Sequence, residues 1–202
     1  MTLGLLVAIR IRYQKALVKN PDNSGEAGLR IRLAERSELH CLQAIERAAD
    51  KLFPTGRLPD LTDVMPLEAL GKAQDNGLLW VAVWDGAIAG FAVSQLFGDF
   101  LHLAEMAVHP DYGRRGIGSQ LLTAVIQQAV ERKRSGVILT TFQDFPWNAP
   151  FYEKRGFRIL ANSELNPMLR NILAQEASFG MKNRVAMLYS TTCNKSMEVR
   201  YD

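Results

Sequence analysis

Apolar residues recur at three- and four-residue intervals in the first third of the chain, which is the spacing of amphipathic helices. This spacing predicts one helix over 37–53 and a second over 66–77. Ser37 is the expected N-cap of the first helix, because its short side chain can accept a free amide of the first turn. An alternation of apolar and basic residues at 29–33 precedes both helices and predicts a half-buried strand.

From residue 78 onward the pattern becomes that of strands. Three apolar segments follow one another closely, and Asp85-Gly86 between the first two is a hairpin signal. A long helix then forms a crossover, so the strands on either side of it are expected to be parallel. The predicted elements are strands at 78–84, 87–97, 101–108, 137–142, 157–160 and 184–190, and helices at 116–134, 148–155 and 163–178. This order is typical of a mixed α/β domain over 29–191, between an extension at 1–28 and a tail at 192–202.

Composition narrows the class of protein. The 202 residues are 48% hydrophobic with a net charge of +3, so neither a nucleic-acid nor a membrane partner is expected. The apolar run at 3–9 is too short for a membrane span and lacks the flanks of a secretory signal. Cys41 and Cys193 form no CxxC motif, so no metal site or disulfide framework is expected. A reducing cytoplasm is the expected location.

The segment HPDYGRRGIGSQLL places three glycines and two arginines at the mouth of the long predicted helix. Free N–H groups at a helix N-terminus bind phosphates, and the guanidinium groups of Arg114 and Arg115 add charged donors. The spacing of Gly113, Gly116 and Gly118 matches neither a P-loop nor the dinucleotide fingerprint. The segment predicts a site for a phosphate-rich ligand, with a plain glycine-rich helix cap as the alternative.

The stretch AVHPDYGRRGIGSQLL resembles the acetyl-CoA signature of the GNAT superfamily of N-acetyltransferases, Gln/Arg-x-x-Gly-x-Gly/Ala after a strand ending in Val-x-Pro. NAPFYEKRGF, at 148–157, is similar to the family's second recognisable segment, and the predicted order of elements is the family's order. Gly113 departs from the signature, so a side-chain contact to the cofactor is lost. The resemblance implies the GNAT fold, a central mixed, mostly antiparallel sheet of about seven strands flanked by helices.

The resemblance also implies an activity. The protein would move an acetyl group from acetyl-CoA, its cosubstrate, to a primary amine by direct attack in a ternary complex, without a metal. The strand before the signature would splay from its neighbour and pair its backbone with the pantetheine arm, while the amides of 114–119 wrap the pyrophosphate. The implied cofactor-binding residues are Met106, Ala107, Val108, Gly113, Arg114, Arg115, Gly116, Ile117, Gly118, Ser119, Asn148, Phe151 and Tyr152.

Glu105 and Tyr152 are the candidate catalytic residues. In an ideal strand Glu105 shares its face with Leu101, Leu103 and Ala107. A carboxylate on an apolar face is costly unless it is used, so Glu105 is the expected general base, directly or through water. A solvent-facing position or an arginine partner is the alternative. By resemblance, Tyr152 would protonate the leaving thiolate, unless it is only a packed aromatic, and the N–H of Met106 would donate to the thioester carbonyl.

Other polar residues receive structural interpretations. His102 is expected on the strand face opposite Glu105, and His109 in the turn before Pro110. Asn148 is the expected cap of its short helix and also a contact to the coenzyme. The tryptophans are expected in the core or a pocket wall: Trp80, Trp84 and Trp147. Two acidic residues are expected on a solvated helix face, with a cationic amine as the alternative partner: Glu46 and Asp50.

Two other functions stay open at this stage. One is a non-catalytic acyl-CoA-binding or partner-binding module on the same fold, because function resides in the site and not in the fold. The other is nucleic-acid binding by the basic residues near the N-terminus, Arg10, Arg12, Lys15 and Lys19. By resemblance, the acceptor amine would be selected by 37–77 and about 161–184. The oligomeric state is also open, with a homodimer among the options.

Overall fold

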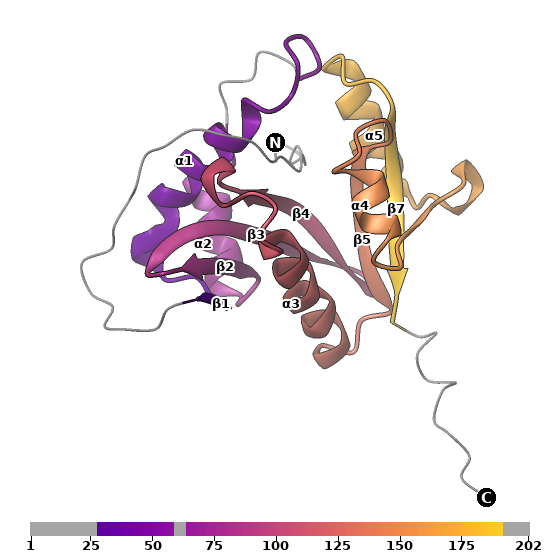
Figure 1. Ribbon diagram of the computed structural model, residues 1–202. Helices are drawn as coiled ribbons and strands as arrows, with labels where there is room; N and C mark the ends of the chain where they lie inside the picture. The colour runs from indigo at the N-terminus through magenta and orange to yellow at the C-terminus, as the bar shows by residue number, and fades with distance from the viewer. Residues whose placement is uncertain (1–27, 59–63, 192–202) are drawn as a thin grey trace, which may run out of the picture.

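The computed structural model describes residues 28–58 and 64–191, which form one seven-stranded sheet in the order β1-β2-β3-β4-β5-β7-β6 (Figure 1). The strands are β1 (Leu29–Leu33), β2 (Leu79–Trp84), β3 (Ala87–Phe97), β4 (Phe100–Val108), β5 (Gly136–Phe142), β6 (Arg158–Ile159) and β7 (Arg184–Ser190). The helices are α1 (Leu39–Asp50), α2 (Leu67–Asp75), α3 (Ile117–Glu131), α4 (Ala149–Glu153) and α5 (Pro167–Ser178). Short 3-10 turns are η1 (Arg36–Glu38), η2 (Pro110–Tyr112) and η3 (Asn162–Glu164). The mixed, mostly antiparallel sheet flanked by helices is confirmed.

The predicted extension and tail, the apolar run at 3–9, the basic residues near the N-terminus and Cys193 lie outside the described residues, apart from Gly28. Among the residues that the structure describes, no helix is both long and apolar enough to cross a membrane. Several helix boundaries differ from the prediction, among them those of α3 and α5. The long helix α3 ends at Glu131, and α5 begins only at Pro167, after the separate turn η3.

Strands β4 and β5 pair in parallel, as predicted, but only over a short length. Phe100, Leu101 and His102 face Gly136, Val137 and Ile138. Beyond these three pairs β4 continues to Val108 and β5 to Phe142, and the two ribbons diverge (Figure 1). The stretch 103–108 therefore has a strand partner, β3, on one side only. The splayed strand that the family resemblance implied is present.

A β-bulge in β4 changes which side chains share a face of the sheet. Val93 of β3 pairs with Glu105, but the next residue, Ser94, pairs with Leu103. Ala104 is therefore the extra residue of the bulge. Residues that pair across antiparallel strands point to the same face, so Glu105 and Leu103 lie on opposite faces. The expectation that they share a face, which assumed an ideal strand, is wrong, and it is wrong for Leu101 too.

The same bulge relocates His102. Its partner on β3 is Gln95, two residues from Val93, so His102 lies on the same face as Glu105 and not on the opposite face as expected. Ala107 keeps its expected place beside Glu105, because both lie on the same side of the bulge. One extra residue thus places the side chains of Leu101, His102 and Leu103 on the faces opposite to those that an ideal strand predicts.

The first helix begins later than predicted, because residues 36–38 form the 3-10 turn η1. Ser37 lies inside this turn and is not the N-cap of α1. The turn is closed by Glu38, whose Oε2 accepts the backbone N–H of Glu35 at 2.7 Å. This bond caps η1, and α1 itself begins without a side-chain cap.

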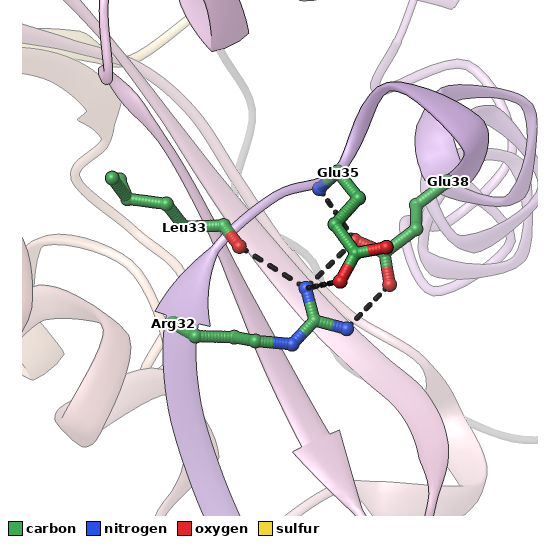
Figure 2. A network of polar contacts seen from close by, with 4 residues as sticks. All are labelled: Arg32, Leu33, Glu35 and Glu38. Carbon is green, nitrogen blue, oxygen red and sulfur yellow. Dashed lines mark hydrogen bonds and ion pairs between the residues drawn. The ribbon is translucent and has the colours of Figure 1, made fainter. Parts of the chain in front are cut away.

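Glu38 also joins the end of β1 to the start of α1 (Figure 2). Arg32 donates to both carboxylate oxygens of Glu38, at 2.5 and 2.8 Å, and to Leu33 O at 3.1 Å. Burial alone would raise the pKa of Glu38. The hydrogen bonds from Arg32 and from the Glu35 backbone outweigh burial, so the pKa is lowered and the carboxylate stays charged.

Candidate active site

The loop between β4 and α3 presents a row of free backbone amides. The amides of 114–118 donate to no backbone carbonyl of the described residues. At either end of the row the amides are used, since Gly113 donates to Pro110 O and Ser119 to Gly116 O. The first turn of α3 adds the partial positive charge of a helix N-terminus. Five consecutive free donors at this position can bind an anion, and the row is shorter by one residue than the amides of 114–119 that were expected to do so.

The conformation of this loop explains part of its sequence. Gly116 has a φ of +80°, which favours glycine, and Arg114 also adopts a left-handed φ of +60°. Gly113 has a φ of −58°, which any residue adopts, so its glycine is not required by the backbone. A Cβ at Gly118 would lie 3.6 Å from Phe151 Cζ, an ordinary contact, so alanine would fit there. Gly116 is thus the position in the motif where the structure needs glycine.

Tyr152 on α4 is fully buried, and its hydroxyl finds no hydrogen-bond partner among the described residues. Its ring lies 5.2 Å from that of Phe151 and 5.3 Å from that of Phe157. Burial, followed by the negative charge of Glu105, raises the pKa of Tyr152 well above its ordinary value. The phenol is therefore a protonated donor that lacks an acceptor within the described protein.

Glu105 on β4 is 3% exposed, which excludes the solvent-facing alternative. Its Oε1 accepts the backbone N–H of Met106 at 3.1 Å. This is the amide that the family resemblance assigned to the thioester carbonyl, so the carboxylate holds that donor in the absence of substrate. The charge of Glu105 contributes, after burial, to the raised pKa of Tyr152, so the two candidate catalytic groups interact electrostatically.

A family model described as an acetyltransferase (GNAT) domain matches residues 75–159, which include β4, the amide loop and α4. This segment thus resembles the GNAT acetyltransferase domain. Its fold resembles that of N-acetylglutamate synthase from Neisseria gonorrhoeae, with 21% identity, a TM-score of 0.62, and coverage of 82% of this chain and 36% of that one. The chain thus spans about a third of that protein's length.

Two other solved structures match nearly along their whole length. Ribosomal-protein-S18-alanine N-acetyltransferase from Escherichia coli has 19% identity and a TM-score of 0.57, with 80% of this chain and 93% of that one covered. The PaiA N-acetyltransferase from Thermoplasma acidophilum, in complex with coenzyme A, has 17% identity and a TM-score of 0.62, covering 81% and 99%. These likenesses establish the GNAT fold.

The remaining predicted cofactor residues of the GNAT domain line the same region. Met106, Ala107 and Val108 are buried in the part of β4 that lacks a β5 partner, and Ile117 is buried as the first residue of α3. Asn148 is buried at the N-cap position of α4, but its side chain makes no cap hydrogen bond there. The expected capping role of that side chain is therefore wrong. Its backbone oxygen instead accepts the N–H groups of Phe151 and Tyr152.

Two residues of the GNAT domain have structural roles. His102 is fully buried, and burial lowers its pKa to about 4, so it is a neutral core histidine. His109 belongs to the turn as expected, and its Nδ1 accepts the N–H of Asp111 at 3.3 Å. Trp80, Trp84 and Trp147 are all half-buried.

The prediction that the acidic residues of α1 lie on a solvated face is wrong for Glu46. Glu46 is buried, and both its carboxylate oxygens accept the N–H of Met65, at 3.0 and 3.1 Å. It therefore fixes the segment that leads into α2 and does not lie on a solvated face. Asp50 is half-buried near the end of the same helix.

An aromatic bridge joins the two diverging parts of the sheet. It consists of Phe53, just after α1, and three residues at and after the end of β5: Phe142, Phe145 and Trp147. The Phe53 ring lies 5.2 Å from that of Phe142 and 5.0 Å from that of Phe145. Arg57 adds an ion pair to Asp144 at 2.5 Å. This bridge connects the segment after α1 with the loop before α4.

Three charged residues near the site have contacts that the sequence did not predict. Arg184 and Glu176 form a buried ion pair at 2.6 Å, and Thr140 also donates to Glu176 at 2.7 Å. Arg155, just after α4, donates to Ser119 Oγ in the first turn of α3. No local pattern marks such residues, because their partners are 8 to 36 positions away in the sequence. In the part of the chain described, no cluster of three or more His, Cys, Asp or Glu residues could hold a metal ion.

Proposed function

We propose that the protein transfers an acetyl group from acetyl-CoA to a primary amine by direct attack in a ternary complex. The observation that carries this proposal is the burial of a carboxylate, Glu105, whose charge raises the pKa of a second buried group, Tyr152. The Tyr152 hydroxyl has no partner among the described residues. A module that only binds coenzyme A would need neither group. Amine acetylation needs a base for the amine and an acid for the departing sulfur, and these two residues can supply both.

The residues present fit acetyl-CoA. The five free amides of 114–118 suit its pyrophosphate, and the unpaired backbone edge of β4 at 106–108 suits its pantetheine arm. The hydroxyl of Tyr152 is a buried donor without an acceptor, and such groups are costly unless a ligand completes them. Acetyl-CoA supplies the activated thioester carbonyl, which a free amine can attack.

The chain's own groups have separate tasks in this proposal. Glu105 accepts the proton that the amine loses on forming the new C–N bond, directly or through water. The N–H of Met106 exchanges its bond to Glu105 for one to the carbonyl oxygen, where negative charge develops. Tyr152 gives its proton to the sulfur as the C–S bond breaks, and its raised pKa keeps that proton available at neutral pH.

We propose a cytoplasmic enzyme without a membrane or nucleic-acid partner, and a homodimer remains an option for its assembly. In this proposal the acceptor is selected by 37–77 and about 161–184. The names of the similar structures point to different acceptors. One names an alanine of ribosomal protein S18, and another names bound N-acetyl-glutamate. A test panel therefore needs free amino acids, peptides and polyamines.

The proposal is tested by titrating the protein with acetyl-CoA and then following CoA release with each amine of the panel. We expect saturable binding and release of CoA with at least one amine, together with a product heavier by one acetyl group. Binding without acetylation of any amine would favour the non-catalytic module. Failure to bind acetyl-CoA would show that the free-amide loop is not a coenzyme site.

A further inference from the structure

Arg155 stands at the edge of the free-amide loop and is held there before any ligand binds. Its Nη1 donates to Phe151 O at 2.7 Å, and its Nη2 donates to Ser119 Oγ. The guanidinium carbon lies 3.6 Å from the centre of the Phe151 ring. Because Ser119 directly follows the five free amides, the charge of Arg155 lies beside them.

No acidic residue in the described part of the chain balances the charge of Arg155. It forms an ion pair with no carboxylate of the described residues. Two of its five N–H groups are used by the hydrogen bonds above, which leaves three donors. A partly buried cation next to a row of free donors, with no acceptor to share, favours an anion in the same place.

Arg115 of the motif is engaged elsewhere. Its guanidinium lies 5.1 Å from the Trp84 ring and 5.6 Å from the Tyr112 ring. It also donates to Asp111 O at 3.3 Å. Gly113 has no side chain where the family signature has Gln or Arg. The motif therefore lacks one of the polar side chains that the signature has, and Arg155 offers a cation from outside it.

We propose that Arg155 binds an oxygen of the coenzyme's pyrophosphate, together with the backbone amides of 114–118. This inference rests on the proposed function, since it requires that acetyl-CoA binds at the loop. Phe151 and Ser119 hold the guanidinium in place, so the ligand need not order a long free side chain. Arg155 thereby replaces the side chain that Gly113 lacks.

The test measures the affinity of the full chain for CoA and for 3′-dephospho-CoA by calorimetry. Arg155→Ala should weaken both by the same factor, roughly 10- to 100-fold, because each ligand keeps the pyrophosphate and loses one charge-assisted contact. Arg155→Lys should recover part of the loss, since it keeps the charge but not the planar geometry. Lys154→Ala is the matched control, with an exposed side chain one residue away and an unchanged affinity expected.

Each other outcome is decisive. A loss confined to CoA would mean that Arg155 contacts the 3′-phosphate, which overturns the assignment to the pyrophosphate. Unchanged affinity of both variants would make Arg155 a structural tie between α3 and α4. If Arg155→Ala unfolds, Arg155→Lys decides, because it should fold and still bind more weakly than wild type. Absence of binding by the wild type would overturn the proposed function itself, a result distinct from any change in the variants.

Discussion

The carboxylate of Glu105 accepts the backbone N–H of the next residue, Met106, at 3.1 Å. One donor in the site is therefore held by the group proposed as the base. In the proposed reaction this hydrogen bond breaks for two reasons. The amide must donate to the thioester carbonyl, and the carboxylate must accept a proton from the amine. The relationship makes substrate binding the event that releases both groups for their tasks.

Glu105→Gln should remove the base while keeping the shape of the side chain and its bond to Met106. We expect the kcat/KM for the amine to fall by about 10²- to 10⁴-fold, the range of general-base contributions, with the affinity for acetyl-CoA unchanged. Steady-state CoA release and calorimetry measure the two quantities. Glu131→Gln, at the exposed end of α3, is the control. Full activity in Glu105→Gln would remove Glu105 from the mechanism.

Tyr152→Phe should affect activity and stability in opposite directions. The variant loses the proposed acid, so kcat should fall. It also removes a buried hydroxyl that has no partner among the described residues, so the free energy of unfolding should rise by about 1 kcal/mol. Denaturant unfolding measures the gain, with Tyr189→Phe, a half-buried tyrosine on β7, as the comparison. A clear loss of stability in Tyr152→Phe would assign the hydroxyl a structural partner instead.

Glu176→Gln should destabilise the protein strongly. The substitution leaves the charge of Arg184 buried without its carboxylate, and breaking such a pair costs about 3–5 kcal/mol. Guanidinium unfolding measures the change in the free energy of unfolding. Glu153→Gln, an exposed position on α4, should leave it unchanged. A small effect of Glu176→Gln would show that water reaches Arg184.

His102 should make the protein less stable as the pH falls. Its pKa is about 4 in the folded state, because burial disfavours the charged form, and about 6.5 when unfolded. Between these values the unfolded state binds a proton that the folded state does not. The free energy of unfolding should therefore decrease on acidification through this window, by up to about 3 kcal/mol from His102, and be unaffected by His102 above it.

His102→Gln should flatten this part of the stability curve, while His40→Gln, at an exposed histidine on α1, should not. The measurement is denaturant unfolding of the three proteins at several pH values from 4 to 7. Parallel curves for wild type and His102→Gln would mean that the buried imidazole accepts its proton without unfolding.

Much of the fold follows from local signals in the sequence. The hairpin at Asp85-Gly86 is an example, because both residues adopt the positive φ that such a turn requires. The crossover over α3 likewise fixes β4 and β5 as parallel. The motif also predicted where the structure has a row of free amides and a left-handed glycine, since both features at the start of a helix have local causes.

The errors arose where a local pattern depended on a distant partner. The segment FLHLAEMAV contains no glycine or proline, so nothing in it marks Ala104 as a bulge, and the faces of Leu103 and His102 were assigned from ideal alternation. In the sequence Glu46 looks like any charged residue of a helix. Only the folded structure shows that it accepts the N–H of Met65. Arg155 reads as the solvated end of a helix, and only α3 packed against α4 gives it Ser119 as a partner.

The three-residue ladder between β4 and β5 has a consequence for the cooperativity of the whole domain. Strands β1 to β4 are joined by antiparallel ladders, and β5 is joined to β7 by seven residue pairs, so each part is well connected internally. Segments connected in this way open as units in hydrogen exchange. The domain should then open first between these two units, at the junction that lies beside the proposed site.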